Sequence, residues 1–433
     1  MEHITIHYDR IIQPMRPMHA VNNGPIIARA DQTRGNGDAY RAARIPFART
    51  HDAAFCADYG GEHTVDISAI FPNWDSDPSD PSSYDFVVTD NYLREIRSVG
   101  TAVYYRLGSK IEHGVKKYGT LPPRDNAKWA DICAHIIAHY NEGWADGFRW
   151  DIQYWEIWNE PDLDPDDAAN KKCWGGTAAE FYEFYRTAAT ALKARFPHLK
   201  IGGPAVARVC PSDWLDGFLA ALTRDGERVP LDFFSWHQYG TEPKALAAQQ
   251  ALVREKLNRA GYSATESICN EWNYVAGWTD KFIASVEAIN GIKGAAYTAA
   301  GMCAAQHAGM DMLMYYDARP SVFNGLFDFY TMRPLKGYYP FLAFSELYAL
   351  GNQVESHTDD PDLYAAAAVG DGGARAAMVV YYTDDDAAAP KTVAIDGDYA
   401  ECRLLDVAHD WCVVPFDGTI CLAPNSVLLV MGH

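Results

Sequence analysis

The chain has 433 residues, 48% of them hydrophobic, which allows one large domain or a large domain with a smaller one. Its net charge of −20 argues against nucleic acid or an anionic membrane surface as the main partner. Because no apolar run could cross a bilayer, no secretory signal is visible and the nine cysteines are scattered, we expect a cytoplasmic protein with reduced thiols.

Residues 3–8 alternate polar and apolar side chains, as a short strand does. Eight further extended segments follow, beginning at Met18, Arg44, Thr101, Ile152, Leu199, Leu231, Glu266 and Asp311. Helical spacing of apolar residues separates them, over residues 32–43, 90–99, 125–142, 177–196, 212–224, 243–260, 280–307 and 334–350. Strands that alternate with helices indicate parallel βαβ units. The sequence therefore predicts an α/β fold, a closed (β/α)₈ TIM barrel over residues 14–350.

The pattern changes after Gly351, where helical periodicity disappears. Short apolar runs separated by Asp, Gly and Pro take its place, at residues 363–367, 376–382, 392–395, 402–407, 411–414 and 426–431. We expect residues 351–433 to form an antiparallel β-sandwich, joined by the N-terminal strand within residues 1–13.

Polar residues end nearly every predicted barrel strand. They are Asn22, Asn23, His51, Asp52, Arg106, Asn159, Glu160, His237, Tyr239, Asn270, Glu271 and Tyr316. The chemistry of a (β/α)₈ barrel sits at the carboxyl ends of its strands. We therefore expect these side chains to meet at one cleft.

Glu160 closes a segment rich in β-branched and aromatic residues, and Pro161 should end that strand. A carboxyl group in an apolar, partly dry site can keep its proton near neutral pH and act as a general acid. The alternative is a loop-facing Glu that caps a helix or pairs with a surface Arg. Glu156 lies deeper on the same strand, which predicts a buried structural role paired with an Arg or a hydroxyl.

Glu271 ends the seventh predicted strand and should face Glu160 across the cleft. Two carboxylates that flank a cleft are the minimum machinery for glycoside hydrolysis. Trp272 and Trp278 follow Glu271 and are candidates for an aromatic platform, because the C–H side of a pyranose packs well on aromatic faces.

A metal site or a cofactor is not expected. His135 and His139 are one helical turn apart, but they lie before the fourth strand, away from the strand ends, and lack a Glu between them. His51 and Asp52 have no grouped set of further ligands. An aldolase-type barrel would need a Lys at a strand end, and none is found there.

Three motifs carry a family resemblance: Trp155-Glu-Ile-Trp-Asn-Glu-Pro-Asp162 with the later Glu271, Arg49-x-His51, and His237-Gln-Tyr239. With them the chain resembles glycoside hydrolase family 39, the β-xylosidase and α-L-iduronidase group within the clan of retaining (β/α)₈ glycosidases. The resemblance implies that Glu160 is the acid/base and Glu271 the nucleophile. It further implies that Asn159 holds the sugar 2-hydroxyl, that Tyr239 hydrogen-bonds the nucleophile, and that His51 and His237 line the −1 subsite.

The expected activity is that of a retaining exo-glycosidase on small oligosaccharides, β-xylosidase-like or α-L-arabinosidase-like. Asn23, Arg106, Trp272 and Tyr316 complete the expected carbohydrate-binding set. Family xylosidases tend to carry a Trp near the end of strand eight, whereas Tyr315, Tyr316 and Asp317 stand here, which leaves the sugar open. A catalytically inactive carbohydrate-binding barrel is the alternative, and a homo-oligomer is left open.

Overall fold

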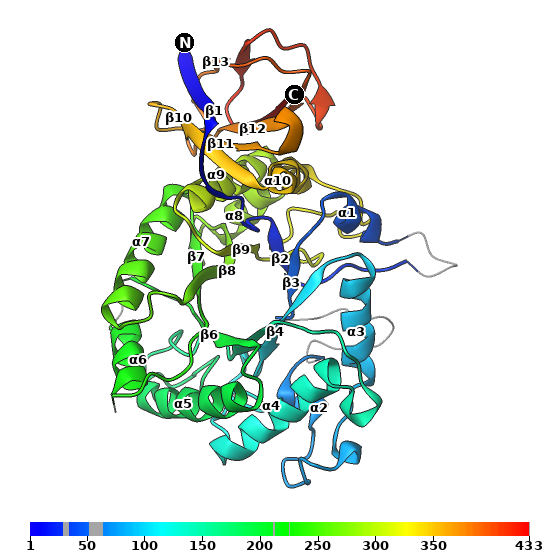
Figure 1. Ribbon diagram of the computed structural model, residues 1–433, viewed down its shortest axis with the longest axis vertical. Helices are drawn as coiled ribbons and strands as arrows, with labels where there is room; N and C mark the ends of the chain where they lie inside the picture. Colours follow the sequence, from blue (N-terminus) through cyan, green and yellow to red (C-terminus); the bar gives the residue numbers. More distant parts are fainter. Residues whose placement is uncertain (29–33, 52–63, 211–212, 225, 433) are drawn as a thin grey trace.

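The computed structural model describes residues 1–28, 34–51, 64–210, 213–224 and 226–432. Eight parallel strands close into a barrel with helices around it (Figure 1), which confirms the predicted (β/α)₈ architecture. In barrel order the strands are β2 (Ala20–Asn22), β3 (Phe47–Arg49), β4 (Ala102–Leu107), β5 (Tyr154–Ile157), β6 (Lys200–Val206), β7 (Phe233–Gly240), β8 (Glu266–Tyr274) and β9 (Met312–Tyr315).

The helices are α1 (Gly37–Ala42), α2 (Ile67–Ile70), α3 (Val87–Ser98), α4 (Asn126–Asn141), α5 (Ala178–Arg195), α6 (Trp214–Thr223), α7 (Lys244–Arg259), α8 (Phe282–Ile289), α9 (Ile292–His307) and α10 (Tyr339–Leu350). Short 3₁₀ turns lie at Pro81–Ser83, Trp144–Asp146, Lys336–Tyr338 and Asp371–Gly373. Residues 32 and 33 of the first predicted helix, and Asp52, lie outside the described residues.

The interior of the barrel is layered. Apolar and aromatic side chains fill the layer formed by Ala20, Tyr104, Tyr154, Phe233, Ile268, Met312 and Met314. Buried polar side chains, among them Arg49 and Glu156, form the next layer toward the carboxyl ends of the strands. This change from apolar to polar packing positions the functional site at the carboxyl end.

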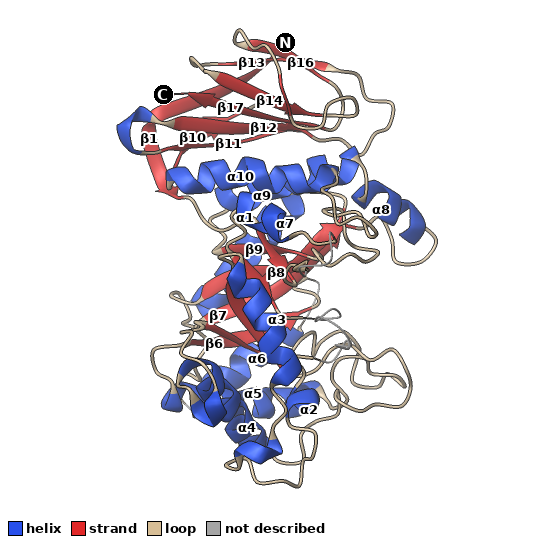
Figure 2. Cartoon of the chain, turned by 90° about the vertical axis from the view of Figure 1, so that its right-hand side faces the viewer, coloured by secondary structure: helices blue, strands red, loops and turns tan. Residues whose placement is uncertain are grey.

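The single helical stretch predicted over residues 280–307 is wrong, because α8 and α9 are separate helices. Asn290 and Gly291 separate them, and Gly291 has extended backbone angles (φ −109, ψ −171). The break lets α9 run between the barrel and the terminal sheet (Figure 2). Most residues of α9 are buried there. Its Ala and Gly residues permit this close approach.

The terminal domain is a nine-stranded sheet whose pairs are antiparallel except for the parallel pair β1–β13. The strands are β1 (Glu2–Pro14), β10 (Asn352–His357), β11 (Leu363–Val369), β12 (Arg375–Tyr381), β13 (Lys391–Ile395), β14 (Glu401–Leu405), β15 (Cys412–Val413), β16 (Thr419–Leu422) and β17 (Ser426–Gly432). The mostly antiparallel all-β character predicted for this part is confirmed. The N-terminal strand β1 lies between β10 and β13.

Both faces of the central strands are covered. On β11, Ala365 and Ala367 face the core within the sheet domain, whereas Ala366 and Ala368 face the larger core shared with the barrel helices. Small side chains let α9 and α10 pack closely against the sheet (Figure 2). We propose that residues 351–433 have a structural role. Along the described chain, no helix combines the length and the apolar character needed to span a membrane.

Candidate active site

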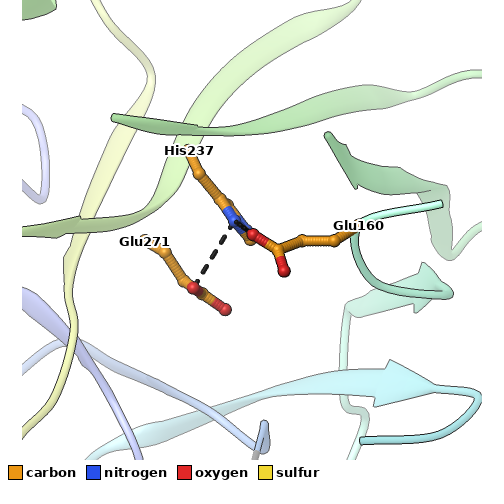
Figure 3. A group of neighbouring side chains, drawn as sticks. All are labelled: Glu160, His237 and Glu271. Carbon is orange, nitrogen blue, oxygen red and sulfur yellow. Dashed lines mark hydrogen bonds and ion pairs between the residues drawn. The ribbon is translucent and has the colours of Figure 1, made fainter. Parts of the chain in front are cut away.

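A cleft of about 830 Å³ opens at the carboxyl ends of the barrel strands. Glu160 and Glu271 both line it, together with His51, His237, Tyr239 and Tyr316. Six of the ten site residues proposed from the sequence thus line this one cleft. Figure 3 shows Glu160 and Glu271 on either side of the His237 ring.

Glu160 lies in a tight turn beyond the end of β5. Both Trp158 (φ 76) and Glu160 (φ 48) have left-handed backbone angles, which are uncommon for residues other than glycine. The N–H of Glu160 donates to the Ala205 carbonyl at 2.9 Å, and Pro161 follows without a donor of its own. This turn replaces the predicted continuation of the strand and carries the carboxylate into the cleft.

Glu271 reaches the cleft through an irregularity in β8. Cys269 pairs with Trp236 and Glu271 with His237, so Asn270 is an extra residue between the two pairs. Asn270 donates to Glu156 inside the barrel, while Glu271 accepts from Arg49 beside it. Two consecutive side chains therefore point inward. Such bulges re-aim side chains and are common next to active sites.

Both oxygens of Glu271 accept hydrogen bonds. Arg49 Nη1 donates to Oε1 at 2.8 Å, and the Tyr239 hydroxyl donates to Oε2 at 2.9 Å. Burial opposes the charge on Arg49, but Glu156 and Glu271 outweigh it and raise the pKa of the guanidinium. Burial and the nearby Glu271 charge raise the pKa of Tyr239, so it stays a donor. Glu271 is thus held in one orientation.

His237 bridges the two carboxylates. Its Nδ1 lies 2.9 Å from Glu160 Oε1 and 3.4 Å from Glu271 Oε2 (Figure 3). Burial lowers the pKa of His237 to about 4, although the Glu271 charge acts in the opposite direction. The imidazole is therefore neutral near neutral pH, and its contact with Glu160 is a hydrogen bond rather than an ion pair.

His51 is the second neutral histidine of the site. Burial, followed by the charges of Arg49 and Arg106, lowers its pKa well below the usual value. Arg106 Nε donates to Nδ1 of His51 at 3.2 Å, so the ring proton is on Nε2. That nitrogen lies 3.6 Å from Glu271 Oε1. Arg106, itself fully buried and paired with Asp66, therefore orients His51.

The two carboxylates are close. An oxygen of Glu160, an oxygen of Glu271 and a ring nitrogen of His237 lie within 4.8 Å of one another. In retaining glycosidases the pair is about 5–5.5 Å apart, against about 6.5–9.5 Å in inverting ones. This separation suits direct attack by one carboxylate on a carbon whose leaving oxygen the other protonates.

Glu160, His237 and Glu271 are also the one group of three potential ligands that could hold a metal ion among the described residues. Two features disfavour a cation there. The Arg49 guanidinium already contacts Glu271, and a metal ion beside it would meet a like charge. Each oxygen of Glu271 also already accepts a hydrogen bond, one from Arg49 and the other from Tyr239. The arrangement suits proton transfer and nucleophilic attack better than metal binding.

Trp272 was expected to contact sugar, but it does not reach the cleft. Its side chain is fully buried and packs against Tyr297 and Tyr315. A Cβ added to Gly301 of α9 would lie only 2.4 Å from the Trp272 ring, so the ring occupies the space between β8 and α9. The extra residue at Asn270 shifts the alternation, and Trp272 points out of the barrel.

Asn23 and Arg106 were also expected to bind carbohydrate, but neither side chain lines the cleft. Asn23 is 3% exposed; it donates to Asp317 at 3.0 Å and accepts from the Tyr92 hydroxyl at 3.0 Å. It thus joins the loops after β2 and β9. Arg106 contacts the site through His51.

Asn159 lies beside the cleft but does not line it as Glu160 does. Its Oδ1 accepts from Arg49 Nη2 at 2.6 Å, and the side chain is buried. Arg49 therefore contacts both Asn159 and Glu271. In the sequence, Arg49 stands out as part of the Arg-x-His motif, and its position two residues before His51 at a strand end is the signal that places it in the site.

Two aromatic residues complete the mouth of the cleft. Trp278 is 58% exposed and its ring centroid lies 5.1 Å from that of Tyr239. Phe323 lies 6.0 Å from Trp278 and 5.6 Å from Tyr316. Trp278 was weighed with Trp272 from the sequence, and it is the one that reaches the cleft. Phe323 follows a loop without a recognisable signal, and sequence reasoning missed it.

The profile of the family described as glycosyl hydrolases family 39 matches residues 64–284, slightly more than half of the chain. A β-xylosidase of Caldicellulosiruptor saccharolyticus is 28% identical over 191 residues, which is 41% of this chain and 35% of that protein. A β-xylosidase of Geobacillus stearothermophilus is 34% identical over 126 residues, 28% of this chain and 22% of that protein. The matches thus span about a third or less of these relatives.

Solved structures share the fold over the whole chain. A glucosidase from Croceicoccus marinus superposes with a TM-score of 0.80 at 23% identity, covering 100% of this chain and 98% of that one. A monomeric β-xylosidase from Caulobacter crescentus gives a TM-score of 0.68 at 15% identity, covering 100% and 99%. At these identities the likeness concerns the arrangement of barrel and terminal sheet.

Proposed function

This chain belongs to glycoside hydrolase family 39, and from that premise we propose that it is a retaining exo-glycosidase acting on small oligosaccharides. The observation that carries the proposal is the close carboxylate pair at the ends of β5 and β8. Glu271 is held by Arg49 and Tyr239, and Glu160 faces it across His237. An inactive carbohydrate-binding barrel would have no need of two carboxylates held this way.

In the proposed reaction, Glu271 attacks the anomeric carbon while Glu160 gives its proton to the glycosidic oxygen. The bond to the leaving group breaks and a glycosyl ester forms on Glu271. Glu160, now a carboxylate, takes a proton from water, and that water displaces Glu271 from the sugar. Asn159 keeps its amide nitrogen for the sugar 2-hydroxyl, since its oxygen accepts from Arg49.

A terminal pentose is the sugar that we propose, in a β-xyloside or an α-L-arabinoside. Support comes from the curated relatives, both of which are described as β-xylosidases. Tyr316 lines the cleft near the position where family xylosidases tend to carry a Trp, whereas Tyr315 is buried in the core. A screen of aryl xylosides, arabinosides, galactosides and glucuronides would identify the sugar.

Mechanism-based labelling tests the function. We expect a fluorinated, activated xyloside or arabinoside to add one glycosyl unit to the protein, on the peptide that contains Glu271, by mass spectrometry. NMR of the first product from a normal substrate should show the anomeric configuration of that substrate. An unlabelled protein without turnover of any glycoside would support the inactive barrel, and an initial product of inverted configuration would exclude retention.

Trp278→Ala should weaken binding without changing the chemistry. The exposed indole lines the cleft beside Tyr239 and offers a face for a sugar ring. We expect KM to rise roughly 2- to 10-fold, with kcat nearly unchanged, because stacking contributes about 0.5–1.5 kcal/mol. Tyr330→Ala is the matched control, since Tyr330 is 79% exposed and lies outside the cleft wall. An unchanged KM for Trp278→Ala would remove this residue from the substrate site.

A further inference from the structure

Glu156 is a fully buried carboxylate that side chains from several barrel strands contact. Its Oε2 accepts from Arg49 Nε of β3 at 2.7 Å. Its Oε1 accepts from the Tyr104 hydroxyl of β4 at 3.2 Å, from Ser235 Oγ of β7 at 2.6 Å, and from the Asn270 amide of β8. Glu156 itself lies on β5, so five of the eight barrel strands contribute to this contact.

Arg49 connects Glu156 to the active site. Its Nη1 donates to Glu271 at 2.8 Å and to Asn22 Oδ1 at 3.1 Å, and its Nη2 donates to Asn159 at 2.6 Å. The guanidinium is planar, so its orientation against Glu156 also determines where the other two nitrogens point. One buried cation thus contacts two carboxylates, of which only Glu271 reaches the cleft.

We propose that Glu156 is a positioning residue for the nucleophile: it holds the Arg49 guanidinium against Glu271 and Asn159 and balances its charge. This inference rests on the proposed glycosidase function. Glu156 is fully buried and absent from the cleft wall, so its effect passes through Arg49.

The negative charge of Glu156 also affects the reactivity of Glu271. With Glu156 present, the Arg49 cation is shared between two anions. Without the Glu156 charge, the whole cation would act on Glu271, which would stabilise its ionised form and make it a weaker base and nucleophile. Among the described residues, other titratable groups near Glu271 include His51 after β3, Glu160 after β5, His237 and Tyr239 on β7, and Cys269 on its own strand.

Glu156→Gln is the direct test, because it removes the charge at almost constant volume. In either orientation the amide would also place its N–H donors against groups that donate to Glu156. We expect the rate constant for labelling by the fluorinated glycoside to fall about 10²-fold, the loss typical of a misplaced reacting group. We expect the acidic limb of the kcat/KM profile to move down by about one pH unit. Thermal unfolding reports whether the variant is folded.

Tyr104→Phe is the matched control. It removes one neutral donor from the same carboxylate and leaves the charge in place. Its labelling rate should stay within about threefold of the wild-type rate, with an unchanged acidic limb. If Glu156→Gln behaves like Tyr104→Phe, Glu156 serves only the core and the inference is overturned.

Glu156→Asp covers the case in which Glu156→Gln does not fold. It keeps the charge and shortens the reach to Arg49 by one methylene. We expect slower labelling with an acidic limb close to that of the wild type, because position changes and charge does not. A folded Glu156→Asp with the wild-type labelling rate would overturn the inference. The wild-type protein tests the proposed function separately from the role of Glu156. If the wild type is neither labelled nor active, the proposed function fails. If it is labelled, the Glu156 variants decide the positioning role.

Discussion

Glu271→Ala is expected to abolish turnover of every glycoside, whether its leaving group is activated or not. In the proposed mechanism Glu271 forms the bond to the anomeric carbon, and no leaving group compensates for a missing nucleophile. We expect kcat/KM to fall by at least about 10⁴-fold on both activated aryl glycosides and disaccharides. Steady-state kinetics on the two substrate classes measures this, and the fluorinated glycoside should no longer label the protein.

Glu266→Ala is a control on the same strand. Glu266 begins β8 at the opposite end of the barrel and pairs there with Lys200 and the Tyr154 hydroxyl. Because this pair is partly exposed, its loss should cost roughly 0–1 kcal/mol of stability and leave kcat unchanged. Added azide offers a further check on Glu271→Ala, since it should attack from the vacated face and give a glycosyl azide of inverted configuration. Residual activity of Glu271→Ala on activated glycosides close to wild type would assign the nucleophile elsewhere.

The alternation of strands and helices was enough to predict the barrel. Each predicted strand overlaps one of the strands β2–β9, because parallel βαβ units carry a strong local pattern of apolar runs and helical spacing. Several polar residues predicted near the strand ends meet at one cleft, because the carboxyl ends of the parallel strands lie on the same side of the barrel. His51, Glu160 and Tyr316 follow β3, β5 and β9, and His237 lies within β7.

Local backbone irregularities limited the prediction of side-chain direction. Trp272 was expected near the sugar because it directly follows Glu271, but the extra residue at Asn270 turns Trp272 outward. A bulge of this kind depends on pairing with β7, which sequence alone does not reveal. In the same way, Asn23 has a left-handed φ of 67 after β2, and its side chain joins the loops rather than the cleft.

Contacts between distant segments limited the prediction of the polar core. The position of Glu156 along β5 predicted a buried, paired carboxylate, and the Arg49 contact confirms that pairing. The convergence of Arg49, Tyr104, Ser235 and Asn270 on it depends on closure of the barrel. No spacing within one segment encodes such a meeting point, since its members come from five strands.

Glu160→Ala should separate substrates by their leaving groups. A disaccharide needs its glycosidic oxygen protonated, so its kcat/KM should fall about 10²- to 10⁴-fold. A dinitrophenyl glycoside leaves without a proton, so formation of the glycosyl-enzyme should be nearly as fast as in the wild type. Hydrolysis of that intermediate then becomes limiting, because the base that activates water is missing. A pre-steady-state burst of dinitrophenol, followed by slow turnover, is the expected result.

Azide distinguishes a lost acid/base from a damaged fold. It needs no base, so it should accelerate turnover of the dinitrophenyl glycoside by Glu160→Ala and give a glycosyl azide of retained configuration, because it enters from the face that Glu160 vacated. Asp164→Asn is the matched control, since Asp164 lies in the same loop and pairs with Lys172 instead of facing His237. It should show wild-type kinetics without an azide effect. Equal losses of Glu160→Ala on both substrate classes, with no azide product, would place the acid/base at another residue and leave Glu271 as the only assigned carboxylate.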